Sequence, residues 1–249
     1  MKRSVVFGPV ASRRLGRSLG IDPIMGHICC QDCIYCEAGK TETLTVRRQS
    51  YVPTEEILNA LEKVLCLQPE LDYITFSGTG EPTLSTGLGE IIRFIKTKYP
   101  RYAVCLLTNG MLLGDPALRR EIQEADLVIP SLDASDPEEF QKINRPAADI
   151  TFDKFVDDLS GFTHVFPGQI WLELFIVPGI NDSQASIGRF AQIISRMRLD
   201  KIQLNALDRP GTENSIPISS AENAERFAAA LKSFAPVEFI GRKNPSQSS

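Results

Sequence analysis

The sequence predicts an α/β fold in which helices cover a parallel β-sheet. After residue 50, strand-like apolar runs alternate with amphipathic helical patterns, and this alternation is typical of parallel sheets. The strand candidates are almost continuous apolar runs, as expected for strands that are buried on both faces. With 249 residues, the chain can bury such a core without disulfide bonds.

Strand and helix candidates recur along the whole chain. The strand candidates cover residues 18–24, 72–78, 103–110, 126–133, 170–179, 201–205 and 237–240. Helical spacing of apolar residues predicts helices at about 54–65, 88–99, from 115 onward, and at 152–162, 183–197 and 221–234. Residues that favour helix starts are Thr54, Asp115 with Pro116, and either Asp182 or Ser183.

We interpret residues 1–249 as a single domain, because no repeat or linker interrupts this pattern. Residues 1–50 form an N-terminal segment that carries a cysteine-rich loop, and the polar tail 243–249 is expected to be frayed. The apolar run near the N-terminus is too short for a signal peptide, and no apolar stretch approaches the ~20 residues that span a bilayer. We therefore expect a soluble, cytoplasmic protein without a membrane partner.

Polar or small residues end most of the predicted strands. These ends are Ser77-Gly78, Thr108-Asn109-Gly110, Ser131-Leu132-Asp133, Pro178-Gly179 and Asn205. In parallel α/β barrels the carboxyl ends of the strands form the active site. Because the cysteine loop follows the first strand candidate, we expect it to lie at the same face as these residues.

Four of the six cysteines fall within residues 29–36, which indicates metal or redox chemistry in an intracellular protein. Thiolates are the usual protein ligands of iron–sulfur clusters. Four cysteines with His27 could instead bind zinc, although structural zinc sites usually take their ligands from two separated segments. Cys66 and Cys105 stand alone in apolar patterns and are predicted to be small buried hydrophobic residues.

Charge is distributed unevenly in a chain whose formal net charge is −4. Residues 1–50 contain eight Lys or Arg and four Asp or Glu, so the rest of the chain is acidic. Five arginines flank the cysteine loop in sequence and could attract an anionic substrate or an acidic partner: Arg13, Arg14, Arg17, Arg47 and Arg48. They could equally be ordinary solvated side chains.

Two motifs together carry a family resemblance. Cys29, Cys33 and Cys36 form a CxxxCxxC pattern with Tyr35 before the last cysteine, and residues 77–83 read Ser-Gly-Thr-Gly-Glu-Pro-Thr. With these motifs the chain resembles the radical S-adenosylmethionine (radical SAM) superfamily, the second motif being similar to its Gly-Gly-Glu motif. The resemblance implies a partial (β/α)6 TIM-like barrel and a [4Fe–4S] cluster. It also implies three cluster ligands, Cys29, Cys33 and Cys36, and a fourth iron chelated by the amino and carboxylate groups of S-adenosylmethionine.

The same resemblance implies which residues bind the cofactor. They are Tyr35, Gly78, Thr79, Gly80, Glu81, Asn109, Ser131, Asp133 and Asn205. Glycines at two of these positions would let the backbone approach a ligand closely. Asn109 could instead belong to an ordinary turn, and Asp133 could cap the helix beginning near Asp136. Cys30 is not expected to be a ligand, since adjacent residues project in different directions.

A closer resemblance is to a subgroup of uncharacterised iron–sulfur oxidoreductases that is similar to the wyosine-forming tRNA enzymes. It rests on residues 7–22, 144–146, 171–179 and 208–213. Those tRNA enzymes bind a second cluster through further N-terminal cysteines, whereas no cysteine precedes Cys29 here. This difference and the acidic net charge weaken a tRNA assignment.

The resemblance also implies an activity. An electron from a flavodoxin or ferredoxin reduces the cluster, and S-adenosylmethionine is cleaved to methionine and a 5′-deoxyadenosyl radical. The radical then abstracts hydrogen from a small molecule or an RNA base. Alternatives are an activase that places a radical on a protein partner, and a non-enzymatic iron–sulfur or zinc protein. No catalytic side chain is assigned, since Glu173 and Arg145 are better explained by structural ion pairs.

Overall fold

The computed structural model describes residues 4–207, 211–213 and 216–240. Its larger sheet has eight strands in the order β1-β2-β5-β6-β7-β8-β9-β10. These strands are β1 (Val6–Ser12), β2 (Gly16–Ile21), β5 (Tyr73–Phe76), β6 (Ala103–Thr108), β7 (Leu127–Pro130), β8 (Gln169–Phe175), β9 (Lys201–Asn205) and β10 (Val237–Phe239). The predicted tail 243–249 lies outside the described residues.

All neighbouring strands from β2 to β10 pair in parallel, and only β1 pairs antiparallel, with β2. The predicted α/β fold is confirmed: β2 and β5–β9 form a partial (β/α)6 barrel, with β10 added at one edge. Strand β1 was not predicted, because its sequence contains glycine and proline and most of its residues are exposed.

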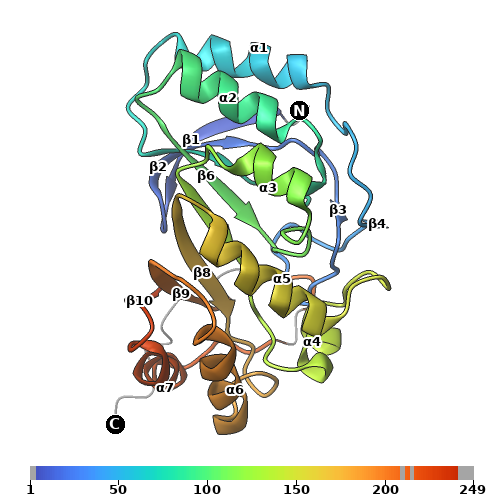
Figure 1. Ribbon diagram of the computed structural model, residues 1–249, viewed down its shortest axis with the longest axis vertical. Coiled ribbons are helices and arrows are strands. Elements are labelled where there is room, and N and C mark those ends of the chain that lie inside the picture. The colour runs from blue at the N-terminus through green and yellow to red at the C-terminus, as the bar shows by residue number, and fades with distance from the viewer. Residues whose placement is uncertain (1–3, 208–210, 214–215, 241–249) are drawn as a thin grey trace.

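The helices follow the strands of the barrel along the chain, and Figure 1 shows α1, α2, α3 and α5 along one side of the sheet. They are α1 (Thr54–Leu65), α2 (Leu88–Lys98), α3 (Pro116–Ile122), α4 (Pro137–Ile143), α5 (Phe152–Val165), α6 (Gln184–Ile194) and α7 (Ala221–Leu231). Asp115, Asp136 and Ser183 cap α3, α4 and α6 with their side chains. The predicted N-cap at Thr54 is wrong by one residue, because Pro53 occupies that position and no side chain caps α1.

The two faces of the sheet bury different residues. Alternate strand residues such as Ile74, Val104 and Leu172 belong to the main core, which includes the apolar faces of the helices. The intervening residues, including Cys105, Leu127 and Ile129, form a separate cluster. Leu15, in the turn between β1 and β2, also belongs to this cluster, so that turn lies against the inner face of the barrel.

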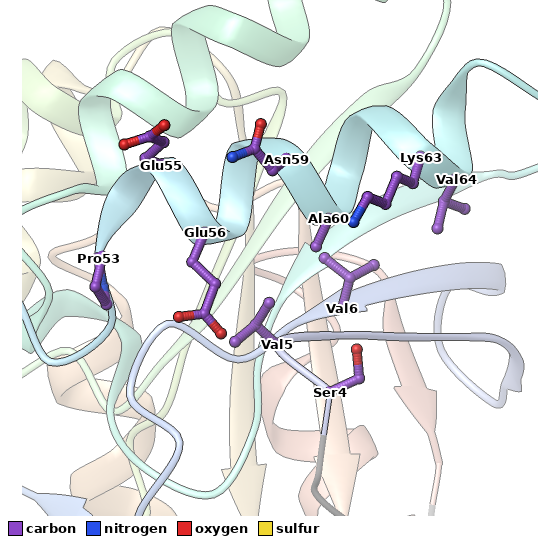
Figure 2. Close-up of a pocket in the computed structure, with 10 residues that line it drawn as sticks. All are labelled: Ser4, Val5, Val6, Pro53, Glu55, Glu56, Asn59, Ala60, Lys63 and Val64. Carbon is purple, nitrogen blue, oxygen red and sulfur yellow. The ribbon is translucent and has the colours of Figure 1, made fainter.

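A hollow of about 740 Å³ lies between the N-terminal end of β1 and helix α1. Figure 2 shows Val5, Val6 and Lys63 among the side chains around it. None of its lining residues belongs to the cysteine loop or to the polar strand ends. In the described part of the chain, no helix is long and apolar enough to cross a membrane.

Candidate functional site

The cysteine loop leaves the barrel after β2 and includes a small two-stranded sheet, in which β3 (Ile28–Cys29) pairs in parallel with β4 (Thr43–Leu44). The thiols of Cys29, Cys33 and Cys36 are free and half-buried. Cys30 differs from them, because its side chain is fully buried in the main hydrophobic core. The fold therefore separates Cys30 from the three predicted cluster ligands.

The three half-buried thiols lie close enough to influence one another. Burial raises the pKa of Cys29 to about 12, and the neighbouring Glu81 and Cys36 add to this rise. Burial also raises the pKa of Cys33, and Asp133, Cys29 and Cys36 raise it further. The raised pKa values mean that deprotonating these thiols is unfavourable. Because cysteine binds metals as the thiolate, a bound metal would have to compensate the free energy of deprotonation.

Amide donors are directed at two of the sulfurs. Asn109 Nδ2 lies 3.4 Å from Cys29 Sγ, and Asn144 Nδ2 lies 3.5 Å from Cys33 Sγ. Among the described residues, no three His, Cys, Asp or Glu side chains are close enough to share one metal ion. In a four-iron cube each thiolate binds a different iron, and hydrogen bonds to the sulfurs are typical of such sites. The donor set thus fits an iron–sulfur cluster.

Two distant segments hold the cysteine loop by backbone hydrogen bonds. On one side, Asn144 and Ile143 at the end of α4 accept from the backbone N–H groups of Asp32 and Ile34. On the other side, Glu213 donates its backbone N–H to Ile34, and Thr212 Oγ1 donates to the Cys36 carbonyl.

Gly211 belongs to the second of these segments and packs directly on Tyr35, where a Cβ would lie 2.7 Å from the Tyr35 carbonyl carbon. An ion pair between Arg145 and Glu213 then joins the two segments to each other. Both segments contain motifs that the sequence connected with the closer subgroup, and the fold brings these motifs together around the cysteines.

Tyr35 links the cysteine loop to strands β7 and β8. Its ring stacks on Phe175 with centroids 3.8 Å apart, and its hydroxyl donates to Asp133 Oδ2 at 2.5 Å. Ile34 and Ile143 pack with Phe175 in a small hydrophobic cluster beneath the loop. Burial raises the pKa of Tyr35 well above its ordinary value, and the nearby Asp133 carboxylate adds to this rise. The phenol is therefore a hydrogen-bond donor at neutral pH.

The carboxylate of Asp133 accepts three hydrogen bonds from the protein. Besides the Tyr35 hydroxyl, the donors are Asn144 Nδ2 at 3.0 Å and the backbone N–H of Phe175 at 3.0 Å. Burial raises the pKa of Asp133, and the hydrogen bond from Tyr35 is the strongest of several opposing effects. Asp133 does not cap α4, because Asp136 occupies the N-cap position and accepts from the Glu139 N–H.

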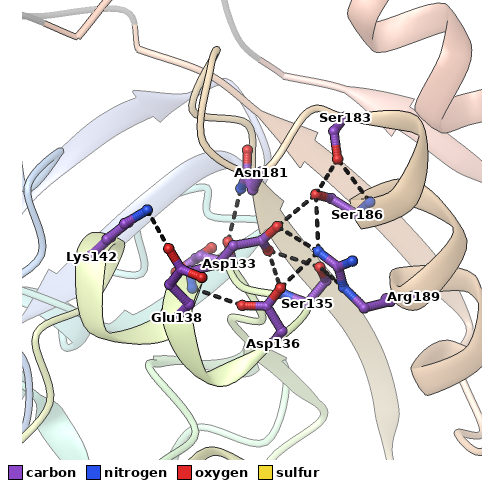
Figure 3. Close-up of polar contacts among 10 residues, drawn as sticks. Asp133, Ser135, Asp136, Glu138, Lys142, Asn181, Ser183, Ser186 and Arg189 are labelled. Atoms are coloured by element: carbon purple, nitrogen blue, oxygen red, sulfur yellow. Dashed lines mark hydrogen bonds and ion pairs between the residues drawn. The ribbon is translucent and has the colours of Figure 1, made fainter.

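The loops that follow β7 and β8 are joined by a buried polar network (Figure 3). Asn181 Nδ2 donates to the carbonyls of Asp133 and Phe175, at 2.8 and 2.7 Å. Glu139 accepts from Ser135 and Ser186, and Arg189 pairs with Glu139. These contacts fix the ends of two neighbouring strands beside Tyr35.

The segment after β5 is fastened to the beginning of the cysteine loop. Gly78 has a φ of +156°, and a Cβ there would lie 2.2 Å from the carboxyl carbon of Asp22. The backbone N–H and hydroxyl of Thr79 both donate to Asp22 Oδ2, at 3.1 and 3.0 Å. A Cβ on Gly80 would lie 2.4 Å from the Ile28 carbonyl oxygen, and Glu81 donates its N–H to that carbonyl. Both glycines thus permit close contact with the protein itself.

Glu81 is fully buried and accepts four hydrogen bonds. Its Oε1 accepts from the backbone and hydroxyl of Thr83, at 3.0 and 2.6 Å, and from the Thr108 hydroxyl at 2.7 Å. Its Oε2 accepts from the backbone N–H of Asn109 at 2.8 Å. Burial raises the pKa of Glu81, although these hydrogen bonds oppose the rise. The carboxylate therefore ties the end of β6 to the turn after β5.

The remaining predicted site residues lie at the ends of other strands. Ser131 follows β7 and forms an isolated parallel bridge with Glu173 of β8. Asn205 ends β9, and its Nδ2 lies 3.3 Å from Glu173 Oε1. The structure brings Cys29, Glu81 and Asn109 into one group through direct contacts or electrostatic proximity, and Cys33, Tyr35 and Asp133 into another. Asn205 contacts neither group directly and belongs to a third cluster around Glu173.

Comparison with known families identifies the chain. Residues 24–191 match the radical SAM superfamily, a span that begins within the cysteine loop, before Cys29, and ends within α6. The chain belongs to the radical SAM superfamily. Its members are enzymes that use a [4Fe–4S] cluster and S-adenosylmethionine, and they require a reductant. The predicted family membership is confirmed.

The chain aligns with a large share of one curated relative and with a small share of another. The chain is 38% identical over 206 residues to the UPF0026 protein slr1464 of Synechocystis sp., covering 82% of this chain and 76% of that protein. It is 41% identical over 237 residues to a protein named GTPase Obg from Brachyspira hyodysenteriae. That match covers 94% of this chain and 34% of the Brachyspira protein, so the chain spans about a third of that relative.

Solved radical SAM structures share the fold. A radical SAM methyltransferase from Sphaerobacter thermophilus superposes with a TM-score of 0.69 at 17% identity, covering 91% of this chain and 67% of that chain. TYW1 with a lysine-pyruvate adduct bound superposes with a TM-score of 0.62 at 17% identity, covering 88% and 74%. At these identities the likeness establishes the radical SAM fold.

Two of the five arginines that flank the cysteine loop in sequence, Arg14 and Arg48, form ion pairs, whereas Arg13, Arg17 and Arg47 are exposed. Arg14 pairs with Glu173 on the inner face of the barrel, and burial lowers the pKa of Arg14. Arg48 forms two hydrogen bonds to Glu121 and two more to backbone carbonyls. Cys66 also differs from its prediction, since it is exposed, whereas Cys105 is buried as predicted.

Several residues of the candidate site were not among the site residues predicted from the sequence. Asp22 holds the turn at Thr79, Phe175 supports Tyr35, and Asn181 joins two strand ends. Asn144 was named only as part of a subgroup motif, although it contacts Cys33 and Asp133. Motif membership was equally a signal for Asp22 and Phe175, which lie in the subgroup motifs 7–22 and 171–179, and Asn181 lies in a turn that resembles one of the family's. Only the fold reveals which distant group each of these residues meets.

Proposed function

We propose that this chain binds one [4Fe–4S] cluster through Cys29, Cys33 and Cys36 and binds S-adenosylmethionine at the remaining iron. The observation that carries this proposal is that three half-buried thiols on one loop lie near one another after the first strand of a radical SAM barrel, with amide donors directed at two of them. The Glu81 segment is fastened to the same loop through the Ile28 carbonyl. When bound, the cluster and S-adenosylmethionine would supply a 5′-deoxyadenosyl radical, which abstracts hydrogen from a small molecule or an RNA base.

The residues of the chain would orient and enclose these groups. Asn109 and Asn144 donate hydrogen bonds to the ligand sulfurs. Residues proposed to line the S-adenosylmethionine site are Tyr35, Gly78, Thr79, Gly80, Glu81, Asn109, Ser131, Asp133 and Asn205. Because the Glu81 and Asp133 carboxylates each accept several hydrogen bonds from the protein, both would act mainly by holding the backbone around the cofactor in place.

We further propose that a flavodoxin or ferredoxin supplies the electron. The segment that contains the cysteines and β4 carries exposed charges of both signs, Lys40 and Arg47 beside Glu37 and Glu42. Formation of 5′-deoxyadenosine with a reduced flavodoxin or ferredoxin in place of dithionite tests this proposal, and no product with either carrier would contradict it.

Anaerobic reconstitution with iron and sulfide tests the activity. We expect about four irons per chain, and reduction with dithionite in the presence of S-adenosylmethionine should yield 5′-deoxyadenosine and methionine. The Cys33→Ala variant is the matched negative control. An intact cluster that produces no 5′-deoxyadenosine above the control would overturn the proposal.

Two measurements separate the substrate classes. Deuterium transfer from a labelled candidate into 5′-deoxyadenosine would identify a substrate directly. Binding of tRNA, measured at low and high salt, tests the RNA class, because phosphate contacts weaken steeply with salt. If tRNA does not bind at low salt, the small-molecule class is favoured.

A further inference from the structure

Asn144 occupies the space between two groups that are negative in a cluster-bound protein. Its Nδ2 lies 3.5 Å from Cys33 Sγ and 3.0 Å from Asp133 Oδ2. An amide nitrogen carries two hydrogens, so one can be directed to each acceptor. The side chain is 2% exposed, which excludes water from competing for these hydrogens.

The position of Asn144 is fixed by the backbone on both sides. Its own carbonyl accepts from the Asp32 N–H at 3.0 Å, and the preceding carbonyl, that of Ile143, accepts from the Ile34 N–H. Ala147 donates its N–H to the Cys30 carbonyl at 2.9 Å. The segment 143–147 therefore runs along the cysteine loop and holds the amide against Cys33.

The orientation of the amide is also determined. Both neighbours of Nδ2 accept hydrogen bonds when ionised, so an exchanged oxygen would face two negative groups. The Oδ1 atom has no hydrogen-bond partner among the described residues, although it is buried. An unsatisfied buried acceptor is costly. In this orientation Oδ1 has no hydrogen-bond donor among the described residues, but Nδ2 can donate to both Cys33 and Asp133.

We propose that Asn144 is a positioning residue that raises the reduction potential of the cluster by donating to Cys33 and by separating it from the Asp133 carboxylate. This proposal rests on the proposed function, since it requires a cluster at Cys33. Hydrogen bonds to cluster sulfurs favour the more negative, reduced state and therefore raise the potential. The same donation to Asp133 limits the negative field that this carboxylate exerts on the cluster.

The test compares two variants of similar shape. Asn144→Leu removes both N–H groups of the amide. Asn144→Asp replaces the amide with a carboxylate beside the Cys33 thiolate and the Asp133 carboxylate. We expect the midpoint potential, followed by the EPR signal of the reduced cluster, to fall in Asn144→Leu and to fall further in Asn144→Asp. Asn59→Leu, at an exposed position of α1, should leave the potential unchanged. Iron content is measured for every sample.

The outcomes distinguish this inference from the proposed function. A wild-type chain that assembles no cluster would contradict the proposed function itself. An Asn144→Leu variant with full iron content and the wild-type potential would overturn only the role of Asn144. Equal potentials in the leucine and aspartate variants would likewise contradict the electrostatic explanation.

A second measurement does not depend on the stability of the Asn144 variants. In protein labelled with ¹⁵N in the asparagine amides, pulsed EPR of the reduced cluster should detect weak ¹⁵N couplings. A coupling that persists in Asn109→Leu supports donation by Asn144, because Asn109 contacts the other sulfur, Cys29 Sγ. The absence of any coupling in the labelled wild type would overturn the proposal.

Discussion

The guanidinium of Arg14 forms an ion pair with the carboxylate of Glu173, joining the turn after β1 to the inner face of β8. Both side chains are largely buried, with 23% and 10% exposed. Asn205 Nδ2 approaches the same carboxylate at 3.3 Å, and Leu15 packs against residues of β6 and β7. The β1–β2 hairpin thus connects the first strands of the open barrel with its last ones.

Removal of Arg14 should destabilise this connection. Arg14→Met leaves the Glu173 carboxylate buried without its cation, so we expect a loss of roughly 2–3 kcal/mol in the free energy of unfolding. The double variant Arg14→Met with Glu173→Met should recover most of this loss, because two apolar side chains can replace a buried pair. Urea unfolding of the metal-free protein measures both effects.

The exposed pair of Lys154 and Asp158 provides the control for that measurement. Surface ion pairs contribute little to stability. The Lys154→Met variant should therefore have the same urea midpoint of unfolding as the wild type. A double variant no more stable than Arg14→Met would show that the pair is not the reason for the loss.

Substitution of Glu81 tests how the strand ends are held together. Glu81→Gln replaces one acceptor oxygen with a donor that faces N–H or O–H groups, so we expect a loss of about 1–3 kcal/mol in stability. Affinity for S-adenosylmethionine should fall as well. The glutamine amide nitrogen would face either the Asn109 backbone N–H or the Thr108 hydroxyl, and that group would lose its hydrogen-bond acceptor. Isothermal titration of the reconstituted protein measures the affinity.

The stability difference between wild type and Glu81→Gln should depend on pH. Because burial raises the pKa of Glu81 above its ordinary value of 4.5, the folded state binds its proton more tightly than the unfolded state. The contribution of this proton to stability is complete below pH 4.5 and is lost as the pH rises through the raised pKa. The advantage of wild type over the variant should therefore shrink above pH 4.5, and growth of that advantage would contradict the assignment.

Two cysteine substitutions test the assignment of the cluster ligands. Cys33→Ala should prevent cluster assembly, whereas Cys30→Ala should retain the full iron content, because the Cys30 side chain lies in the hydrophobic core. Cys66→Ala, at an exposed position, is the control for general handling of the protein. Iron analysis and the visible absorption of the cluster give the result. The ligand assignment would be refuted by full iron content in Cys33→Ala, and also by loss of iron in Cys30→Ala.

Gly211→Ala tests whether the segment 211–213 holds the cysteine loop. A Cβ at Gly211 would lie 2.7 Å from the carbonyl carbon and oxygen of Tyr35, and this backbone cannot rotate away. We expect faster loss of iron to a chelator. In Gly188→Ala, the new Cβ meets nothing within 4 Å inside helix α6, so stability should rise by up to about 1 kcal/mol without faster iron loss. Equal rates of iron loss in the two variants would contradict this role.

The sequence determined the parts of the protein that depend on local patterns. Alternating apolar runs and helical spacing were sufficient for the parallel sheet and for most helix positions, since these periodicities follow from backbone geometry. The spacing of Cys29, Cys33 and Cys36 together with the segment around Glu81 indicated the family, which residues 24–191 confirm. Strand β1 was missed, because an exposed hairpin strand with glycine and proline lacks an apolar pattern.

Only the tertiary structure decided which groups meet across the chain. Asn144 is 111 residues from Cys33 in sequence. Arg14 lies in the turn between β1 and β2, and Glu173 lies in β8, with β5, β6 and β7 between β2 and β8 in the sheet, so no local pattern could pair them. Two neighbouring thiols, Cys29 and Cys30, were separated into site and core by the path of the loop. The sequence determined which chemical groups are present and where the strands end. Long-range packing decided which of those groups share a buried space, because burial removes water and leaves each polar atom dependent on its protein neighbours.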